Sequence, residues 1–473
     1  QQRRLHLNAC RWFSEQGLLD EAIEQVADAG LLRGAIRLTS INDFGRSRLS
    51  GLIDGFHARH PEVSFELALG DDVLPADLRR RLASGEVRRV IGIGHHRSQG
   101  LKGGVVIDLD GAETAIRQAV HAAERMAKVE IQSVILGLSG ARLASQHFEA
   151  EAPVRGGPVS EEDLARVLRM AAREGVASER IALHALPTGY TLDAQEDITD
   201  PAGMIGEKLG VALHVVSAQA AATRNLMLAV ERCHLGVEAV VASPFAAGLS
   251  VLADDEIDMG AIVLDCGGGA TGISVFEGGH LVHVDAFAVG GHHVTMDIAR
   301  GLSTRIAAAE RLKLVHGSAM PDPADERDLF AVPQIDGDER ASATHLPKSH
   351  LVRIITPRIE EILELARDRL TAVGFVARPG RRIVLTGGAS QLAGLQEQAA
   401  RILEGQVRIG RPLGIKALPE AAKGPAFAAS TGLLVYPQVA HEEYFDMRAG
   451  GFFAGTGTDG YLSRVGRWLR ESF

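Results

Sequence analysis

A glycine run that follows an aspartate at the end of an apolar stretch is the feature of this chain most suited to chemistry. In "AIVLDCGGGATGISVF", Asp265 precedes Gly267, Gly268 and Gly269, and a second apolar run then begins. The pattern predicts two strands joined by a tight hairpin, whose glycines adopt positive φ and expose N–H groups to phosphate oxygens. Asp265 would lie within reach of a Mg²⁺ ion or its water shell. A plain glycine-rich turn is the alternative.

Two more glycine pairs lie between a predicted strand and a predicted helix. Gly387 and Gly388, in "VLTGGASQL", precede a helix N-terminus, which suits them to a phosphate or to the edge of an adenosine. Gly290 and Gly291 close a similar turn. Because any strand-to-helix turn favours glycine, a purely structural role is the alternative for both pairs.

An acidic and a basic side chain share one face of the helix predicted at 304–316. In "AAAERLKLVHG", Glu310 and Lys313 are three residues apart. A solvated ion pair is the ordinary interpretation of this spacing.

The elements that must position these residues alternate between strands and helices from about residue 86, as is typical of an α/β protein with a central sheet covered by helices. The predicted strands are 87–96, 103–109, 131–140, 179–192, 211–218, 237–244, 261–265, 272–276, 281–288 and the strand of "RRIVLTGG". The predicted helices are 111–129, 160–175 (with Ser160 as N-cap and Asp163 three residues on), 220–235, 292–302, 304–316 and 351–374. The polar segment 317–350 is predicted to be a loop. The two halves share this pattern, which suggests a duplicated fold with two lobes and a cleft.

The composition limits the class of protein, its partners and its cellular compartment. The 473 residues are 46% hydrophobic and 23% charged, as in ordinary globular proteins, and the net charge of −10 disfavours nucleic acid as a partner. We find neither a signal peptide nor an apolar run long enough to span a membrane. The cysteines, Cys10, Cys233 and Cys266, have no metal-ligand spacing, so we expect three buried thiols in a reduced, cytoplasmic setting.

Taken in order, these residues resemble the motifs of the ATPase superfamily that contains actin, heat-shock chaperones and sugar kinases. Residues 265–269 resemble its second phosphate loop, 310–313 its ribose-side pair, 387–388 its adenosine motif and 241–252 its first connecting helix. The resemblance implies an actin-like, ribonuclease H-like duplicated fold that binds ATP and Mg²⁺. The expected nucleotide-binding residues are Asp265 (also the metal residue), Gly267, Gly268, Gly269, Thr271, Gly290, Gly291, Glu310, Lys313, Gly387 and Gly388.

Within that superfamily the chain resembles FtsA, the bacterial cell-division family. Three stretches carry the resemblance: "GHHRSQGLKGGVVIDLDGAE", "NLMLAVERCHLGVEAVVASPFAAGLSVL" and "HVDAFAVGGHHVTMDIARGL". The resemblance extends from about residue 86 to the C-terminus. It implies a small subdomain peculiar to the family, self-assembly into protofilaments, capture of the C-terminal tail of the tubulin-like protein FtsZ, and recruitment of later division proteins.

The resemblance and the pattern together divide the chain into parts. We expect a helical fragment (1–34), a strand–helix–strand fragment (35–85), subdomain 1A (86–100 and 181–257), subdomain 1C (101–180), subdomain 2A (258–302 and 376–435), subdomain 2B (303–375), a Gly-rich linker (436–459) and an amphipathic helix (460–473).

Two departures from the family pattern weaken the expected nucleotide chemistry. The hydroxyl residues that commonly follow the second phosphate loop are reduced to Thr271, with no acid after it, so we expect at most a weak ATPase. No strand–turn–strand resembling the first phosphate loop precedes Val87. Residues 1–30 instead resemble the helical repeats of MalT-like, LuxR-type activators, and residues 35–72 the start of a LysR-type effector-binding domain. We therefore expect a fusion in which the strand "AIRLTS" docks loosely or fills the vacant sheet edge.

The end of the chain, "GYLSRVGRWLRESF", is amphipathic at about 100° per residue. Its apolar arc contains Tyr461, Leu462, Val465, Trp468, Leu469 and Phe473, and the opposite arc contains Arg464, Arg467, Arg470 and Glu471. This pattern suits a helix in the interface of an anionic membrane, and FtsA-like proteins have a membrane-targeting helix at this position. A terminal helix packed on the body is the alternative.

The resemblance places docking of the FtsZ tail on residues 303–375. Lys348, Arg353 and Arg358 flank the start of the long helix in this part and could meet an acidic peptide. A solvated basic face is the alternative.

The leading hypothesis is a cell-division adaptor that binds ATP and links the FtsZ ring to the cytoplasmic face of the cell membrane at the division site. A kinase-type phosphotransferase on the same fold is the alternative, and would need a catalytic Asp in the N-terminal half and a sugar pocket. A third hypothesis is a regulator fusion that responds to a small effector at residues 35–80. We find no helix–turn–helix to support DNA binding.

Overall fold

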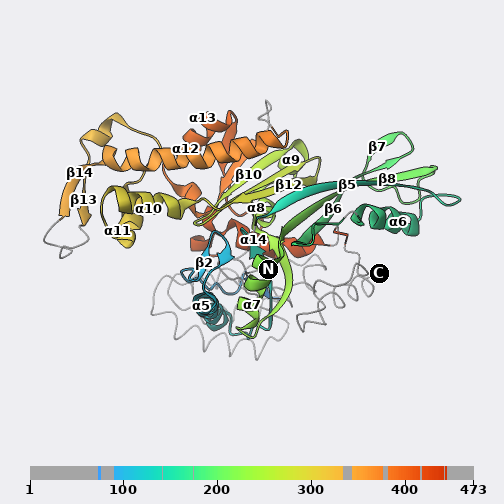
Figure 1. The fold of residues 1–473 in the computed structure, drawn as a ribbon, viewed down its shortest axis with the longest axis horizontal. Coiled ribbons are helices and arrows are strands. Elements are labelled where there is room, and N and C mark those ends of the chain that lie inside the picture. The colour runs from blue at the N-terminus through green and yellow to red at the C-terminus, as the bar shows by residue number, and fades with distance from the viewer. Residues whose placement is uncertain are drawn as a thin grey trace, which may run out of the picture.

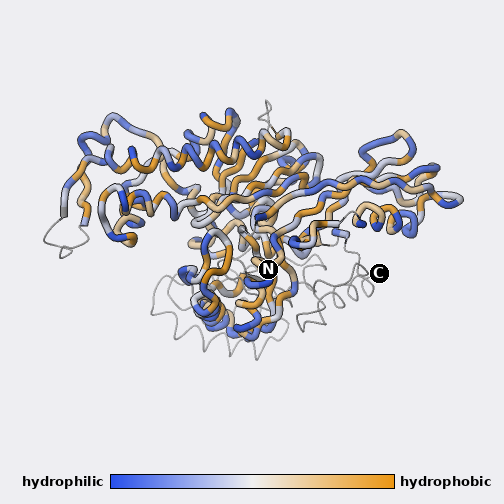
Figure 2. Tube along the Cα trace, in the orientation of Figure 1, coloured by the Kyte–Doolittle hydropathy of each residue, from blue (hydrophilic) through white to orange (hydrophobic). Residues whose placement is uncertain are grey.

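The computed structural model describes residues 73–75, 90–140, 142–173, 175–333, 343–375, 382–415, 418–440 and 443–444. Figure 1 shows an elongated arrangement of these residues, with the β13–β14 hairpin and α11 at one end, a sheet containing β5 to β8 at the other, and α8 and α14 in the middle. The hydrophobic residues gather along the central strands (Figure 2).

A five-stranded sheet forms the centre of the second lobe. Its order is β12 (His280–Phe287), β11 (Thr271–Glu277), β10 (Ala261–Cys266), β15 (Arg382–Thr386) and β16 (Gln406–Ile409). The first three strands form an antiparallel meander, and β10, β15 and β16 are parallel. The helices of this lobe are α10 (Gly291–Gly301), α11 (Ile306–His316), α12 (Lys348–Ala372) and α13 (Leu395–Leu403), and buried residues of the strands and helices form one core cluster.

A smaller sheet forms the first lobe. Its order is β1 (Val73–Pro75), β4 (Ser133–Leu138) and β9 (Gly236–Ala242), accompanied by α5 (Leu109–Ala127) and α7 (Ala220–Glu231). β1 pairs antiparallel with β4 and lies within the segment expected to replace the first hairpin. The strand "AIRLTS", for which we predicted docking at this edge, lies outside the described residues.

A four-stranded antiparallel sheet extends from the first lobe. Its order is β5 (Ala144–Pro153), β8 (Lys208–Gln219), β6 (Arg180–Leu192) and β7 (Gln195–Ile198), and α6 (Glu161–Ala172) packs on it. The Ser160 side chain accepts from Asp163 N and the Asp163 carboxylate accepts from Ser160 N, which confirms the predicted helix start. β6 begins at the residue where the sequence analysis divided subdomain 1C from subdomain 1A, and the four-stranded sheet includes strands on both sides of that residue.

Two helices cross between the lobes. α8 (Ser243–Val251) packs on α14 (Ala428–Val435) so closely that a Cβ at Gly432 would lie 1.6 Å from the carbonyl oxygen of Ala246. α9 (Asp254–Met259) follows α8, and its buried Glu256 pairs with Arg382 and Arg408 of β15 and β16. These contacts fix the connecting segments to the second lobe.

Two differences from the expected elements concern residues 90–96 and residues 317–350. Residues 90–96, the described part of the strand predicted at 87–96, form no strand; Gly94 instead lies against α5, where a Cβ would be 1.7 Å from Ala119 O. The predicted loop 317–350 contains the hairpin β13 (Leu329–Pro333)–β14 (Ala343–Pro347). The short elements that remain are β2 (Leu101–Lys102), β3 (Val105–Val106), η1 (Pro323–Glu326), η2 (Gly388–Gln391), η3 (Glu420–Ala422), η4 (Pro425–Phe427) and η5 (Tyr436–Gln438).

Candidate functional site

The glycine run joins β10 to β11 in the predicted hairpin. Asp265 pairs with Gly272 across the two strands, and Gly267 N donates to Asp265 O (3.1 Å) and to Ala270 O (3.0 Å). None of the three loop glycines has a left-handed φ, so the predicted reason for glycine was wrong. Close approach is the reason at Gly267, because a Cβ there would lie 2.8 Å from Ala270 O.

The start of α10 holds this loop from one side. Gly291 N donates to Gly267 O (2.9 Å) and His292 N to Gly268 O (2.7 Å). A Cβ at Gly290 would lie 2.5 Å from Gly267 O, so only glycine fits there. Gly290 and Gly291 therefore support the loop from the side of α10.

Those loop N–H groups have no acceptor of their own. Gly268 N, Gly269 N and Ala270 N donate to no described residue, although Ala270 is only 7% exposed. A buried backbone donor without an acceptor, as at Ala270, is rare, and together with the more exposed N–H groups of Gly268 and Gly269 it indicates a place for an anionic ligand. This is the arrangement that a phosphate-binding turn requires.

The turn after β15 meets the same loop. Thr386 is in register with Asp265, and Gly387 has φ of +80°. A Cβ at Gly387 would lie 2.5 Å from Asp265 Oδ1. Ala389, next to Gly388 in η2, contacts the position where a Cβ of Gly291 would be. The three glycine turns predicted from sequence are thus brought together.

Glu310 and Lys313 form a connected group with a threonine that sequence analysis missed. Lys313 Nζ lies 2.9 Å from Glu310 Oε2, 2.8 Å from Thr295 Oγ1 and 3.0 Å from Gly291 O. The hydroxyl of Thr295 also donates to Glu310. Burial raises the pKa of Glu310, but hydrogen bonds from Thr295 and Lys313 outweigh it and lower that pKa. Its position one helical turn after Gly291 was the signal for Thr295.

The side chain of Lys313 is largely buried, with 13% of it accessible, whereas that of Glu310 is half-exposed, with 42% accessible. A simple solvated ion pair does not describe that lysine. The group can present a carboxylate and an ammonium to hydroxyl groups of a ligand beside the glycine turns.

Thr271 does not point its hydroxyl at the loop's donors. The residue is buried, and Oγ1 donates to Val289 O at 2.8 Å. The hydroxyl group of Thr271 therefore links β11 to the segment before α10, and does not contact the glycine loop.

Asp265 is the residue expected near a metal. Among the described ranges no group of three or more His, Cys, Asp or Glu side chains could bind a metal ion. Mg²⁺ commonly uses one or two protein carboxylates and completes its shell with phosphates and water. The half-buried Asp265 therefore fits Mg²⁺ that arrives with a nucleotide, and does not form a metal site of its own.

The three basic residues expected to dock a partner differ in their surroundings. Lys348 Nζ pairs with the buried carboxylate of Asp325 at 2.9 Å, and Arg358 pairs with Asp297 at 2.6 Å and with Glu361. Arg353 donates to a carbonyl of its own helix and has no carboxylate partner among the described residues. Of the three, Arg353 is best placed to meet an acidic peptide.

A pocket of about 470 Å³ adjoins Lys348. Its lining includes four acidic residues, namely Asp322, Asp325, Asp328 and Glu397. This acidic lining disfavours an acidic peptide at Lys348.

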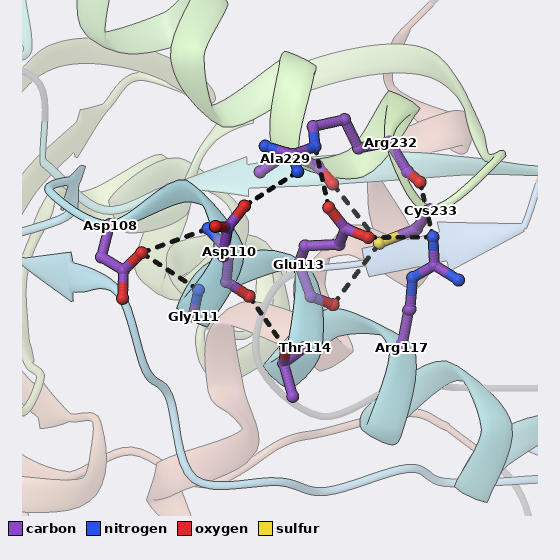
Figure 3. A network of polar contacts seen from close by, with 9 residues as sticks. All are labelled: Asp108, Asp110, Gly111, Glu113, Thr114, Arg117, Ala229, Arg232 and Cys233. Atoms are coloured by element: carbon purple, nitrogen blue, oxygen red, sulfur yellow. Dashed lines mark hydrogen bonds and ion pairs between the residues drawn. The ribbon is translucent and has the colours of Figure 1, made fainter.

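A polar network ties α5 to the end of α7 (Figure 3). Arg232 contacts Asp110 and Glu113, each at 2.8 Å, and Arg117 contacts Glu113 at 2.9 Å. Cys233 lies within this network, and burial raises the pKa of its thiol. Cys233 is half-buried, whereas full burial was predicted. The network is structural and separate from the glycine turns.

Cys266 is buried in β10, as predicted, and burial raises the pKa of its thiol to about 12. Cys10 lies outside the described residues, as do all the residues of the terminal amphipathic pattern: Leu462, Arg464, Val465, Arg467, Trp468, Leu469, Arg470 and Phe473. No helix in the described ranges is long and apolar enough to cross a membrane.

The chain matches known families over both lobes. Residues 262–432 match the family described as cell division protein FtsA, and residues 140–217 match the SHS2 domain inserted in FtsA. The cell division protein FtsA of Rhizobium meliloti (strain 1021) is 53% identical over 384 residues, which cover 81% of this chain and 87% of that protein. FtsA of Escherichia coli (strain K12) is 34% identical over 394 residues, which cover 81% and 92%.

Among solved structures, a chain of the PilM-PilN type IV pilus biogenesis complex is 18% identical with a TM-score of 0.49, over 72% of this chain and 89% of that one. We draw no conclusion from a similarity at this level.

Two α/β lobes, joined by crossing helices and meeting at glycine turns, define a protein of the actin-like ATPase fold. High identity across most of the length of curated relatives specifies the family. The chain belongs to the FtsA family of cell division proteins.

Proposed function

We propose that the chain is a cell-division adaptor that binds ATP between its glycine turns and links FtsZ to the cytoplasmic face of the cell membrane at the division site. One observation supports nucleotide binding above all: the consecutive N–H groups of Gly268, Gly269 and Ala270 have no acceptor among the described residues. FtsA family membership favours this function over the kinase-type alternative. The subdomain boundaries expected from the sequence belong to the same proposal.

In this proposal the phosphates lie on the 267–270 loop and the adenosine lies toward Gly387 and Gly388. Glu310 and Lys313 contact the ribose hydroxyls, and Asp265 faces Mg²⁺ carried by the phosphates. Mg²⁺ would offset phosphate charge. Hydrolysis is slow, because the buried hydroxyl of Thr271 is already bonded to Val289 O.

Nucleotide binding is tested by titrating the full chain with a fluorescent ATP analogue in the presence of Mg²⁺. We expect saturable binding that unlabelled ATP displaces. Binding that is absent, or that AMP and ATP displace equally well, would contradict a phosphate-binding role for the loop.

Membrane tethering is tested by co-sedimentation with vesicles of anionic and of neutral lipid. We expect binding to anionic vesicles that is lost on removal of residues 460–473 and on Trp468→Asp, because a charge on the apolar arc opposes insertion. Ser472→Ala is the matched control at the same end of the chain. Unchanged binding after the deletion would refute tethering through this helix.

Docking of FtsZ is tested with a peptide of its C-terminal tail. We expect Arg353→Ala to weaken binding several-fold, because a charged side chain contributes to electrostatic complementarity at such a surface. Arg367→Ala, on the same helix but beside Asp368, is the matched control. Equal effects of the two substitutions would exclude a specific contact at Arg353. Protofilament formation and recruitment of later division proteins complete the proposed function.

A further inference from the structure

A second glycine turn, from the first lobe, lies directly against the phosphate-loop glycines. Lys102 ends β2, Val105 begins β3, and the two glycines between them, Gly103 and Gly104, have φ of +57° and +76°. A Cβ at Gly269 would lie 3.3 Å from Gly103 N, and one at Gly103 would lie 2.9 Å from the Cβ of Ala288. The two turns thus face each other across the lobes.

The backbone of this turn also has unused donors. Gly103 N and Gly104 N donate to no described residue. The turn packs from behind on Gly140, where a Cβ would lie 2.3 Å from Gly103 O. Its carbonyl side is therefore occupied by the protein, while its N–H groups have no partner that the structure describes.

Lys102 adds a charge to these donors. Its side chain is exposed and forms no ion pair with any described carboxylate, whereas other exposed lysines, such as Lys208 and Lys423, pair with a glutamate. A hairpin turn of two glycines has no structural need for lysine before it. A lysine that adjoins Gly103 and Gly104 in sequence, in a turn that lies against the 267–270 loop, gives an anion-binding combination.

We propose that Lys102, Gly103 and Gly104 form the first-lobe half of the phosphate cradle, opposite Gly268–Ala270. The inference rests on the proposed nucleotide binding and deepens it. No other glycine turn of the first lobe lies against the 267–270 loop in the part of the chain that the structure describes. The ligand of the turn at Gly103 and Gly104 is the terminal phosphate of a nucleoside triphosphate, since the turn meets the 267–270 loop, on which the phosphates are proposed to lie.

The test compares ATP, ADP and AMP with Mg²⁺ on the full chain. We expect Lys102→Gln to weaken ATP binding by about tenfold or more, because a charge-assisted hydrogen bond is lost, and to change AMP binding by less than about twofold. Lys208→Gln, an exposed lysine on the four-stranded sheet, is the matched control and should bind all three nucleotides as the unaltered chain does.

A second measurement does not depend on a variant. Amide hydrogen exchange of the peptide containing residues 101–106 should slow when the chain is saturated with ATP, whereas exchange of the exposed turn at Gly156 and Gly157 should not. If the unaltered chain binds ATP while Lys102→Gln binds it equally well and exchange at 101–106 is unchanged, the inference is wrong and the proposed function stands. If the unaltered chain binds no nucleotide, both are wrong.

Discussion

Glu443 and His184 form a completely buried pair, with Oε1 of the carboxylate 2.8 Å from Nδ1 of the imidazole. The other ring nitrogen, Nε2, accepts from Ala242 N at 3.0 Å, so Nδ1 must carry the hydrogen that is donated to Glu443. Tyr444 N also donates to Ala185 O of β6 at 2.8 Å. A segment close to the C-terminus is thereby fixed to the strand that precedes it by more than 200 residues, and to the start of α8.

Replacing Glu443 separates its hydrogen-bonding role from its charge. Glu443→Ala leaves the Nδ1–H of His184 without an acceptor and should lower the free energy of unfolding by about 1–3 kcal/mol. Glu443→Gln keeps an acceptor oxygen and should cost less. Urea unfolding followed by circular dichroism measures both. Equal losses for the two variants would show that the charge, and not the hydrogen bond, holds the pair.

Acid should destabilise the junction between β8 and β12. His214 Nδ1 lies 2.8 Å from Leu281 O, and its ring stacks on that of His147 at 4.9 Å. Burial, reinforced by the neighbouring His147, lowers the pKa of His214 to about 3. Below about pH 6.5 the unfolded chain takes up a proton that the folded chain refuses until about pH 3. Stability should therefore fall with falling pH in this window, by up to about 1.4 kcal/mol per pH unit for this group.

The measurement is the urea midpoint between pH 7 and pH 4. His214→Gln should give a shallower dependence on pH, whatever it does to stability at pH 7. His121→Gln, on an exposed histidine of α5, should leave the slope unchanged. A slope as steep in His214→Gln as in the unaltered chain would place the titration elsewhere, for example at His147 or His283, whose pKa values are also lowered by burial.

The crossing of α8 and α14 should tolerate no side chain at position 432. In Gly432→Ala the new Cβ meets the backbone oxygen of Ala246, which cannot move without shifting α8, so we expect a loss of about 3 kcal/mol or more. Gly301→Ala is the control, because its Cβ would meet side-chain atoms of Ile354, with Cδ1 at 2.7 Å and Cγ1 at 3.2 Å, and no backbone atom of another element. Thermal unfolding compares the two, and similar stabilities would contradict the tight crossing.

Substitution at Gly290 should displace the backbone of the 267–270 loop. A Cβ there would press on Gly267 O and Gly268 O, so Gly290→Ala should displace the loop and weaken ATP binding by about tenfold or more. Gly236→Ala, whose Cβ would make ordinary contacts, is the control. Nucleotide titration decides, and unchanged affinity in Gly290→Ala would remove the loop from the binding site.

Much of the fold was predictable because its signals are local. The hairpin around Asp265, the capping box at Ser160 and the long helix of "IITPRIEEILELARDRL" each depend on residues a few positions apart. The prediction of a strand at 87–96 was wrong for residues 90–96, because alternation of apolar residues does not reveal whether a neighbouring strand is available for pairing. In the structure Gly94 instead brings this segment against α5.

The glycine turns of the candidate site could be located from the sequence, but their contacts could not. Each glycine turn could be found from its place after a strand, yet the reason for glycine at 267 is a carbonyl oxygen and not a left-handed φ. Gly387 meeting Asp265 requires β15 to lie beside β10, a pairing of strands more than 100 residues apart. The acidic partner of Lys348 was missed because tertiary packing alone places it, and Thr295 was missed because its position one turn after Gly291 does not reveal its contact with Lys313.

The attachment of Tyr444 to β6 limits the distance between β6 and a membrane that binds residues 460–473. Between it and residue 460 there are about 15 residues, so the chain from Tyr444 to residue 460 covers at most roughly 58 Å at full extension. If the terminal helix lies in a lipid surface, that surface must pass within this radius of β6, whichever way the rest of the molecule faces. The buried histidine–glutamate pair therefore determines from which point of the protein the distance to the membrane is counted.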